Sequence, residues 1–252
     1  MKMFKSIRTR ISQGTQYIPD LRTARPVGFR GRPVIGGAPC ETGCDACREI
    51  CPTKAISLNP FALDLGRCVF CNECVKVCPS GKIAFTTDPK MGADARSALV
   101  IGEGAEAIHI RASSAFKKIF GRSLKMRQVS AGGCNACELE LNATANVNFD
   151  LQRFGIEWVA SPRHADALVL TGPMTRNMQD ALQIAWDAMP DPRFLVAVGA
   201  CAISGGLYEG SPVLNRGFLE RIGPAIYVPG CPPHPLTFAN AILDFLQPAP
   251  GR

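Results

Sequence analysis

Twelve cysteines, which fall into three groups of four, are the residues of this chain best suited to bind a metal cofactor. Two groups are compact, and each ends in a Cys-Pro pair (Pro52 and Pro79), whereas the third is spread over 98 positions. Four thiolates hold one cubane iron–sulfur cluster, so the count predicts three [4Fe–4S] clusters with no cysteine left over. The groups are Cys40, Cys44, Cys47 and Cys51; Cys68, Cys71, Cys74 and Cys78; and Cys134, Cys137, Cys201 and Cys231.

The two compact groups are copies of one unit, because three of the four cysteines recur 27 positions later. The second copy has the bacterial ferredoxin pattern C-x2-C-x2-C-x3-C-P, in which the fourth cysteine ligates the other cluster. The repeat therefore predicts crossed ligation. One cluster takes Cys40, Cys44, Cys47 and Cys78, and the other takes Cys68, Cys71, Cys74 and Cys51.

The first compact group departs from the ferredoxin pattern, since three residues rather than two separate Cys40 from Cys44. C-x3-C-x2-C is also the signature of radical S-adenosylmethionine enzymes. Those enzymes usually carry an aromatic residue where this chain has Ala46, and here a second ferredoxin run follows at once. Zinc also takes four-cysteine sites, but two triplet-plus-Cys-Pro runs fit a zinc ribbon poorly. The spacing leaves Cys40 as the ligand with the weakest support.

The beginning of the chain does not have the features of a secretory signal, because its first twenty residues are polar and basic without an apolar core. The longest apolar stretch, at 194–203, is shorter than a membrane span. A cysteine-dense chain without a signal peptide is expected to bind metal rather than to form disulfides. We therefore expect a peripheral protein in a reducing compartment.

The second half of the chain alternates apolar runs with helical patterns, which predicts a doubly wound parallel α/β sheet of the flavodoxin-like kind. The expected strands are 123–129, 156–160, 166–172, 193–200 and 225–230, and the expected helices are 138–147, 177–189 and 235–246. The four dispersed cysteines follow these strands, in the loops at their carboxyl ends, where such sheets gather ligands. The third group is therefore expected to converge on one site.

The chain divides into four expected parts. They are a basic arm (1–33), a small α+β two-cluster ferredoxin domain (34–88), a linker (89–123) and the α/β domain (124–252). Within the linker, Phe116, Ile119 and Phe120 are expected on one helical face.

The arm holds eight Lys or Arg against one Asp in residues 1–32, so it carries the whole net charge of +7. Because it is rich in Gly and Pro, we expect it to be ordered only by a partner protein or by anionic lipid. The alternative is a solvated basic tail. There is no nucleic-acid reader motif, so binding to nucleic acid is not expected.

Four segments, GGCNACELEL, GIEWVASPRHADALVLTGPMTRNM, VAVGACAISGG and VPGCPPHP, resemble the small subunit of membrane-bound, energy-converting [NiFe] hydrogenases. That family includes the formate hydrogenlyase and hydrogenase-4 complexes and is homologous to the 20 kDa subunit of NADH:quinone oxidoreductase. Residues 34–88 resemble the two-cluster ferredoxin subunit of the same complexes, so the chain looks like two subunits fused. The quinone-reducing relatives carry adjacent cysteines where this chain has Cys134 and Cys137, which favours the hydrogenase branch.

The resemblance implies that Cys134, Cys137, Cys201 and Cys231 hold a proximal cluster facing a large subunit. It also implies that the partners of the chain are this large subunit, membrane subunits, and a ferredoxin or formate dehydrogenase-type donor or acceptor. The chain itself is then expected on the cytoplasmic side of the membrane. The chain is not expected to contain a catalytic residue, because a nickel–iron centre needs two further CxxC pairs. His109, His164 and His234 form no spaced ligand set, and Glu138 either relays protons or complements a helix dipole.

The sequence therefore predicts an electron-transfer subunit of a hydrogenase complex, whose active site lies in a partner. One alternative is the same relay in a complex that lacks nickel or reduces quinone. The other is a zinc-stabilised binding protein.

Overall fold

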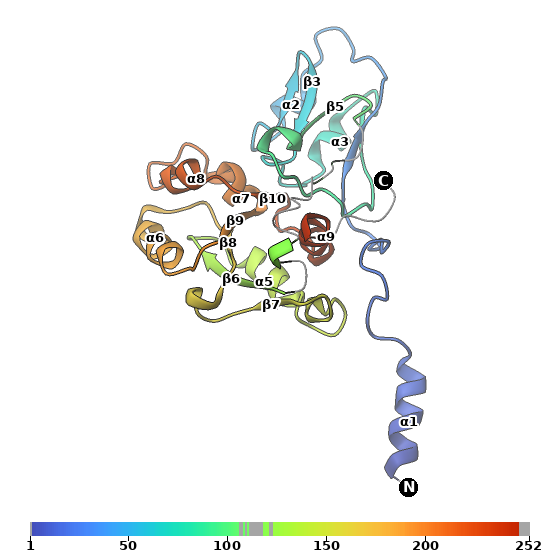
Figure 1. Cartoon of the computed structure of the whole chain (residues 1–252). Coiled ribbons are helices and arrows are strands. Elements are labelled where there is room, and N and C mark those ends of the chain that lie inside the picture. The colour runs from blue at the N-terminus through green and yellow to red at the C-terminus, as the bar shows by residue number, and fades with distance from the viewer. Residues whose placement is uncertain (1, 106–107, 109, 111–117, 121–122, 247–252) are drawn as a thin grey trace.

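The α/β domain is built on one five-stranded sheet in which every pairing is parallel (Figure 1). The computed structural model describes residues 2–105, 108, 110, 118–120 and 123–246. The spatial order β10-β9-β8-β6-β7 is the flavodoxin-like order, with its topological switch point between β6 and β8. The strands are β6 (Leu124–Ser130), β7 (Ile156–Trp158), β8 (Ala167–Thr171), β9 (Phe194–Val198) and β10 (Ile226–Val228).

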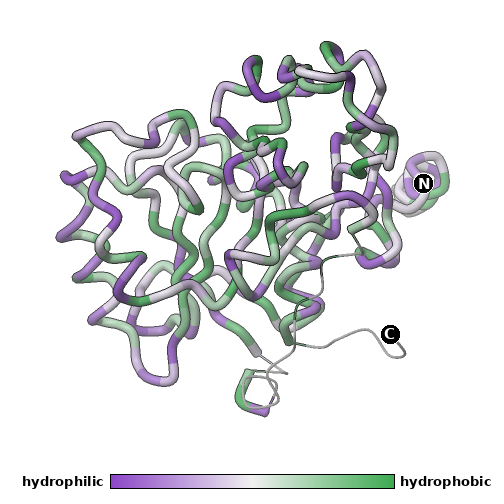
Figure 2. The backbone as a smooth tube through the Cα atoms, turned by 90° about the horizontal axis from the view of Figure 1, so that it is seen from above, coloured by the Kyte–Doolittle hydropathy of each residue, from purple (hydrophilic) through white to green (hydrophobic). Residues whose placement is uncertain are grey.

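Helices cover both faces of this sheet, and every residue of the central strands β8 and β9 is therefore buried. Leu168 and Leu170 belong to the core beneath α6 and α8, while Val169 and Val196 face α9. In Figure 2 the hydrophobic colour follows these inner strands and the outer helices carry more hydrophilic residues. The helices are α5 (Ala136–Ala143), α6 (Gln179–Asp187), α7 (Gly199–Ser204), α8 (Gly217–Ile222) and α9 (Pro235–Leu246), with 3₁₀ turns at Leu151–Phe154, Pro162–His164, Arg176–Met178 and Gly206–Tyr208.

The ferredoxin domain contains two helix–strand units that match the sequence repeat, α2 followed by β2 and α3 followed by β4. Strand β1 pairs with β4, and β2, β3 and β5 form a second antiparallel sheet. Strand β5 comes from the stretch expected to be a linker. The elements are β1 (Pro33–Ile35), α2 (Ala46–Glu49), β2 (Ile56–Leu58), β3 (Phe61–Asp64), α3 (Glu73–Val77), β4 (Ile83–Phe85), a 3₁₀ turn (Arg96–Leu99) and β5 (Val100–Gly102).

The two domains share one hydrophobic core. Ala93 and Tyr227 exchange backbone hydrogen bonds of 3.0 and 2.8 Å, so the stretch after the ferredoxin domain adds to the edge strand β10. Gly66 lies so close to α7 that a Cβ there would be 2.7 Å from Ile203 Cγ2. These contacts fix the ferredoxin domain against the carboxyl-end edge of the sheet.

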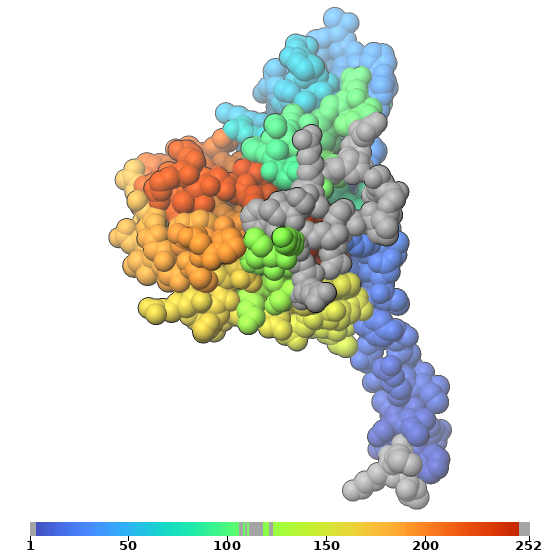
Figure 3. Space-filling view, viewed as in Figure 1, coloured from blue at the N-terminus to red at the C-terminus, as the bar shows by residue number. Residues whose placement is uncertain are grey.

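The arm begins with a helix, α1 (Lys2–Gln13), that extends away from both domains (Figures 1 and 3). The second half of the arm lies on the protein itself. Leu21 is fully buried, its carbonyl accepts a 2.9 Å hydrogen bond from Asn240 on α9, and Arg22 forms an ion pair with Asp244. The expectation that only a partner orders the arm is therefore wrong for this half.

The expected strands and the helices 177–189 and 235–246 are confirmed to within a few residues. Helix α5 begins at Ala136 and ends at Ala143, so it is shorter and earlier than expected. The expected common face in the linker is wrong, because Phe120 is buried while Ile119 is exposed; Phe116 lies outside the described residues. Among the described residues, none of the helices has the length and apolar character needed to cross a membrane.

Candidate functional site

The fourth cysteines of the two compact groups, Cys51 and Cys78, have matching surroundings. The backbone N–H of Ala55 donates to Cys51 Sγ at 3.2 Å, and that of Lys82 donates to Cys78 Sγ at 3.3 Å. A hydroxyl two positions after each cysteine lies 3.8 Å from the sulfur. N–H groups aimed at sulfur stabilise a thiolate, and both copies of the repeat present them in the same way.

The thiols of the two copies interact across the repeat. Burial raises the pKa of Cys47, and the nearby sulfurs of Cys78 and Cys40 raise it further. Burial also raises the pKa of Cys68 to about 12, with Cys51 among the sulfurs that contribute. Cys78 and Cys40 thus lie near enough to Cys47 to raise its pKa, and Cys51 lies near enough to Cys68 to do the same.

The compact groups differ in depth from residue to residue. One sulfur of the first triplet and two of the second are buried, and burial raises the pKa of Cys74 to about 11. For Cys78 burial also raises the pKa, but hydrogen bonds from the backbone of Lys82 and the hydroxyl of Ser80 outweigh it and lower the pKa. Buried thiols of this kind become thiolates only when a metal takes the place of the proton.

The third group converges at the carboxyl ends of β6, β9 and β10. The expectation that all four cysteines lie in loops is corrected for two of them, because Cys137 is in the first turn of α5 and Cys201 is within α7. Both helices begin within a few residues of the carboxyl end of a strand, so the cysteines still lie at the same edge of the sheet. Burial raises the pKa of Cys137, and Glu138, Cys201, Cys231 and Cys134 add to the effect.

A glycine makes room for this group. Gly199 links β9 to α7 with a φ of +87°, and a Cβ at that position would lie 2.7 Å from Cys137 Sγ. Any larger residue would have to adopt a strained backbone and displace the sulfur. The turn therefore brings the backbone as close to the cysteine as a glycine allows.

Two polar side chains support the same edge of the sheet. Glu138 is buried and its carboxylate accepts a hydrogen bond from the hydroxyl of Thr171, at the end of β8. Arg216 donates to the carbonyls of Cys201, Ala202 and Ile203 at 3.3, 2.9 and 2.9 Å, and so satisfies the last turn of α7. Burial lowers the pKa of Arg216. The sequence pattern pointed to Glu138 but not to Arg216.

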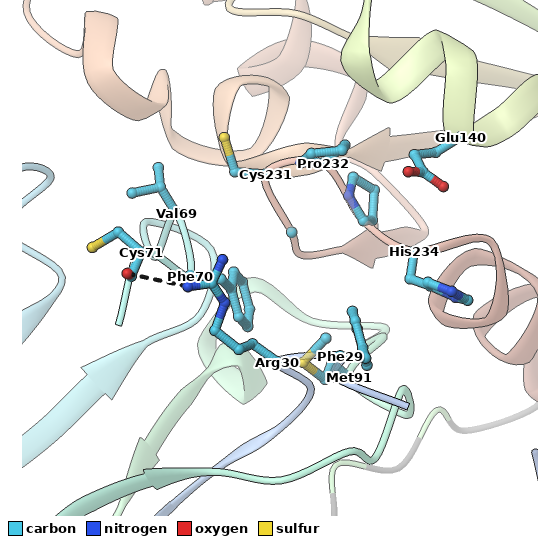
Figure 4. Close-up of a pocket in the computed structure, with 13 residues that line it drawn as sticks. Phe29, Arg30, Val69, Phe70, Cys71, Met91, Glu140, Cys231, Pro232 and His234 are labelled. Atoms are coloured by element: carbon cyan, nitrogen blue, oxygen red, sulfur yellow. Dashed lines mark hydrogen bonds between the residues drawn. The ribbon is translucent and has the colours of Figure 1, made fainter. Parts of the chain in front are cut away.

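A cavity of about 280 Å³ separates the second compact group from the third (Figure 4). Cys71 lies on one side and Cys231 on the other, with Phe29, Arg30 and His234 among the lining residues. Arg30 donates to the Cys71 carbonyl at 3.3 Å, and the rings of Phe29 and His234 are 5.0 Å apart between centroids. The cavity is thus lined by the arm, the ferredoxin domain, α5 and the loop after β10.

The histidines differ in their placement. His234 lines the cavity, burial lowers its pKa, and its Nδ1 accepts from the backbone N–H of Leu236 at 3.1 Å. Its position in the CPPHP segment after β10 was the only signal in the sequence. His164 is exposed ahead of β8, and His109 lies outside the described residues.

The grouped thiols are compatible with iron–sulfur clusters. Within the described chain, no three His, Cys, Asp or Glu side chains are close enough to share one metal ion. A cubane does not require that, because each of its four irons takes a separate thiolate. Grouped thiols, N–H donors to sulfur and a glycine beside Cys137 are the features that such a cluster needs.

Comparison with known proteins agrees with this geometry. The family described as NADH ubiquinone oxidoreductase, 20 Kd subunit, matches residues 134–245, and the 4Fe-4S dicluster domain matches residues 39–82. The probable membrane-bound hydrogenase subunit mbhJ of Pyrococcus furiosus is 39% identical over 131 residues, which make up 52% of this chain and 78% of that protein. The chain belongs to the 20 kDa subunit family.

Other relatives in this family come from two kinds of complex. Formate hydrogenlyase subunit 7 of Escherichia coli is 43% identical over 130 residues, which cover 52% of this chain and 51% of that protein. An NADH-quinone oxidoreductase subunit of Desulfovibrio desulfuricans is 43% identical over 103 residues, which cover 41% of this chain and 56% of that protein. The chain thus spans about half the length of these two relatives.

These findings confirm the resemblance and the fold expected from the sequence. The chain is an iron–sulfur, electron-transfer subunit of an oxidoreductase complex, and it works together with other subunits. The dicluster match removes the zinc-stabilised binding protein from consideration.

Proposed function

We propose that the chain binds three [4Fe–4S] clusters and relays electrons between a donor or acceptor protein and the large subunit of a membrane-bound hydrogenase complex. When it is bound, each cluster carries one electron at a time. The grouping of the thiols supports three ligand sets. They are Cys40, Cys44, Cys47 and Cys78 (first site); Cys68, Cys71, Cys74 and Cys51 (second site); and Cys134, Cys137, Cys201 and Cys231 (third site).

The order of the sites along the relay rests on one observation, that Cys71 and Cys231 line the same cavity. A ligand of the second site therefore lies across the cavity from a ligand of the third. The second site is then the intermediate, and the first site is the end at which the donor or acceptor docks. Cys40, at that end, is exposed, as contact with a soluble redox partner would require.

The large subunit is proposed to cover the edge of the sheet where the third site opens. Cys134 and Cys231 are both exposed there, so a subunit that covers this edge would contact the third site directly. The spacing Cys134-x-x-Cys137 favours the hydrogenase branch over the quinone-reducing one. In the alternative, the same relay serves a complex without nickel. Nickel in the isolated complex, and two CxxC pairs in its large subunit, would decide for the hydrogenase.

The test of the relay order uses two matched variants that each remove one ferredoxin-type cluster. Neighbouring reduced clusters split or broaden each other's electron paramagnetic resonance (EPR) signals. Cys71→Ser should abolish the splitting seen on the third cluster, whereas Cys44→Ser should leave it in place. The unaltered chain should hold about twelve irons and about twelve sulfides, four of each per cluster.

Two results would contradict the proposal. Eight irons or fewer in the fully loaded unaltered chain would remove one of the three sites. Loss of the splitting in Cys44→Ser, with its retention in Cys71→Ser, would reverse the order of the first and second sites.

Helix α1 supports a peripheral location on the cytoplasmic side of the cytoplasmic membrane. Phe4, Ile7 and Ile11 form one apolar stripe along the helix, and these residues are 67%, 49% and 75% exposed. The same twelve residues include four Lys or Arg and no acidic residue. An exposed apolar stripe within a wholly basic helix matches the surface of an anionic bilayer, in which the helix would lie flat.

A further inference from the structure

Lys82 is a buried cation within the ferredoxin domain. Its side chain is only 3% exposed, and its Nζ donates to the Ala38 carbonyl at 2.7 Å. The ammonium also pairs with Glu103 at 2.6 Å and lies 5.1 Å from the centre of the Phe61 ring. A charge at this depth is costly unless it is fully partnered, so its place in a small domain needs a reason.

The backbone of Lys82 contacts the first site, and its ammonium contacts the segment that precedes it. Its backbone N–H donates to Cys78 Sγ, and its carbonyl accepts from Gly36 at 2.8 Å. Gly36 and Ala38 belong to the segment that leads into Cys40. Lys82 thus contacts both Cys78, the fourth cysteine of the first site, and the segment that carries Cys40.

The repeat supplies an internal comparison. The position equivalent to Lys82 in the other copy is Ala55, which is also buried and makes the same N–H hydrogen bond, to Cys51. The backbone is therefore alike at both fourth cysteines, and the difference is the ammonium group. Around the fourth cysteine, the two ferredoxin sites therefore differ by one buried positive charge.

Two other charged side chains near these sites, Glu103 and Arg30, are more exposed than Lys82. Glu103 is 47% exposed, so the negative end of the ion pair lies toward solvent and the positive end lies inside. Arg30 donates to the Cys71 carbonyl beside the second site, but it is exposed, where water screens its field. A buried charge acts through a lower effective dielectric and has the larger influence.

We propose that Lys82 is a positioning residue that fixes the Cys40 segment and raises the reduction potential of the first cluster relative to the second. The inference rests on the proposed ligand sets. A positive charge stabilises the cluster after it has gained an electron, so it favours reduction, and net charge and hydrogen bonds at sulfur are among the factors that set cluster potentials. The first site, where a partner docks, would then hold an electron more readily than its twin.

The test is a redox titration of the full chain, followed by EPR, in which the clusters are measured separately. Lys82→Met keeps the length of the side chain and removes the charge, so the midpoint potential of the first cluster should fall. Glu103→Gln leaves the ammonium without its counter-charge, so the same potential should rise. The second cluster should shift by much less in both variants, and it serves as the internal control.

Each outcome decides between possibilities. Shifts of the first cluster in opposite directions support the proposal. If the iron content is full and the midpoint potentials of the two clusters do not change, or shift equally, the proposal is overturned. If Lys82→Met loses only the first cluster, the positioning role is supported and Glu103→Gln then decides the electrostatic role. Eight irons or fewer in the fully loaded unaltered chain would instead count against the proposed function, whatever Lys82 does.

Discussion

Cys51 belongs by sequence to the first ferredoxin run, yet its sulfur interacts with the thiols of the second. Because its N–H donor, Ala55, belongs to the first run, the cysteine ties the two copies together. We predict that Cys51→Ser damages the cluster of Cys68, Cys71 and Cys74. The other ferredoxin cluster should keep its EPR signal, and iron should fall from about twelve toward about eight per chain.

The matched variant is Cys78→Ser, which should show the reverse pattern because Cys78 lies beside Cys47. Loss of the cluster nearest in sequence from each variant would mean that the ligation is not crossed. Serine is a suitable replacement at both positions, since it keeps the size of the side chain and removes the thiolate.

At the scale of single residues, spacing alone was enough to group the cysteines but not to find their supports. The Cys-Pro runs and the 27-residue offset gave the proposed ligand sets without any knowledge of the fold. Lys82 and Arg216 belonged to no pattern in the sequence, and His234 was marked only by the CPPHP segment. Their roles depend on contacts with Ala38, with α7 and with Phe29 that only the folded chain creates.

At the scale of elements, the long buried strands were predictable because β8 and β9 are apolar at every position, as strands covered on both faces must be. The short helix α7 was missed, since its six residues continue the apolar run of β9 without a polar cap. Strand β5 was missed for a similar reason: three residues carry too little periodicity, and pairing with β3 decides their conformation.

The turn between β9 and α7 yields a prediction at this scale. Gly199→Ala places a methyl group 2.7 Å from Cys137 Sγ and strains a backbone with a φ of +87°. We expect selective loss or distortion of the third cluster, measured as an altered EPR signal, while both ferredoxin clusters remain. Gly37→Ala is the control, because a Cβ there meets nothing within 4 Å and the backbone does not need a glycine. A normal third cluster in Gly199→Ala would show that the turn tolerates the methyl group.

At the scale of the whole molecule, the arm has two parts with different tasks. Leu21 and Arg22 fasten the second part to α9, and Phe29 and Arg30 line the cavity between the second and third sites. Removal of all of residues 1–32 would therefore disturb the core and the relay together. A truncation that ends before Gly14 removes α1 alone and leaves these contacts in place.

This truncation should separate membrane binding from cluster binding. All twelve irons should remain, because the first ligand is Cys40, whereas binding to vesicles that contain phosphatidylglycerol should weaken, by up to about 1 kcal/mol for each basic residue near the surface. The advantage of the full chain should shrink as salt rises, since exposed charges are screened within about 8 Å at physiological ionic strength. Co-sedimentation across a salt series measures this, with pure phosphatidylcholine vesicles and the charge-matched variant Ile7→Ser/Ile11→Ser as controls.

Equal binding of full-length and truncated chains at every salt concentration would contradict a membrane role for α1. If the truncated chain instead lost the large subunit but still bound vesicles, the partner of α1 would be a protein rather than lipid. A helix that lies on lipid has no reason to hold that subunit.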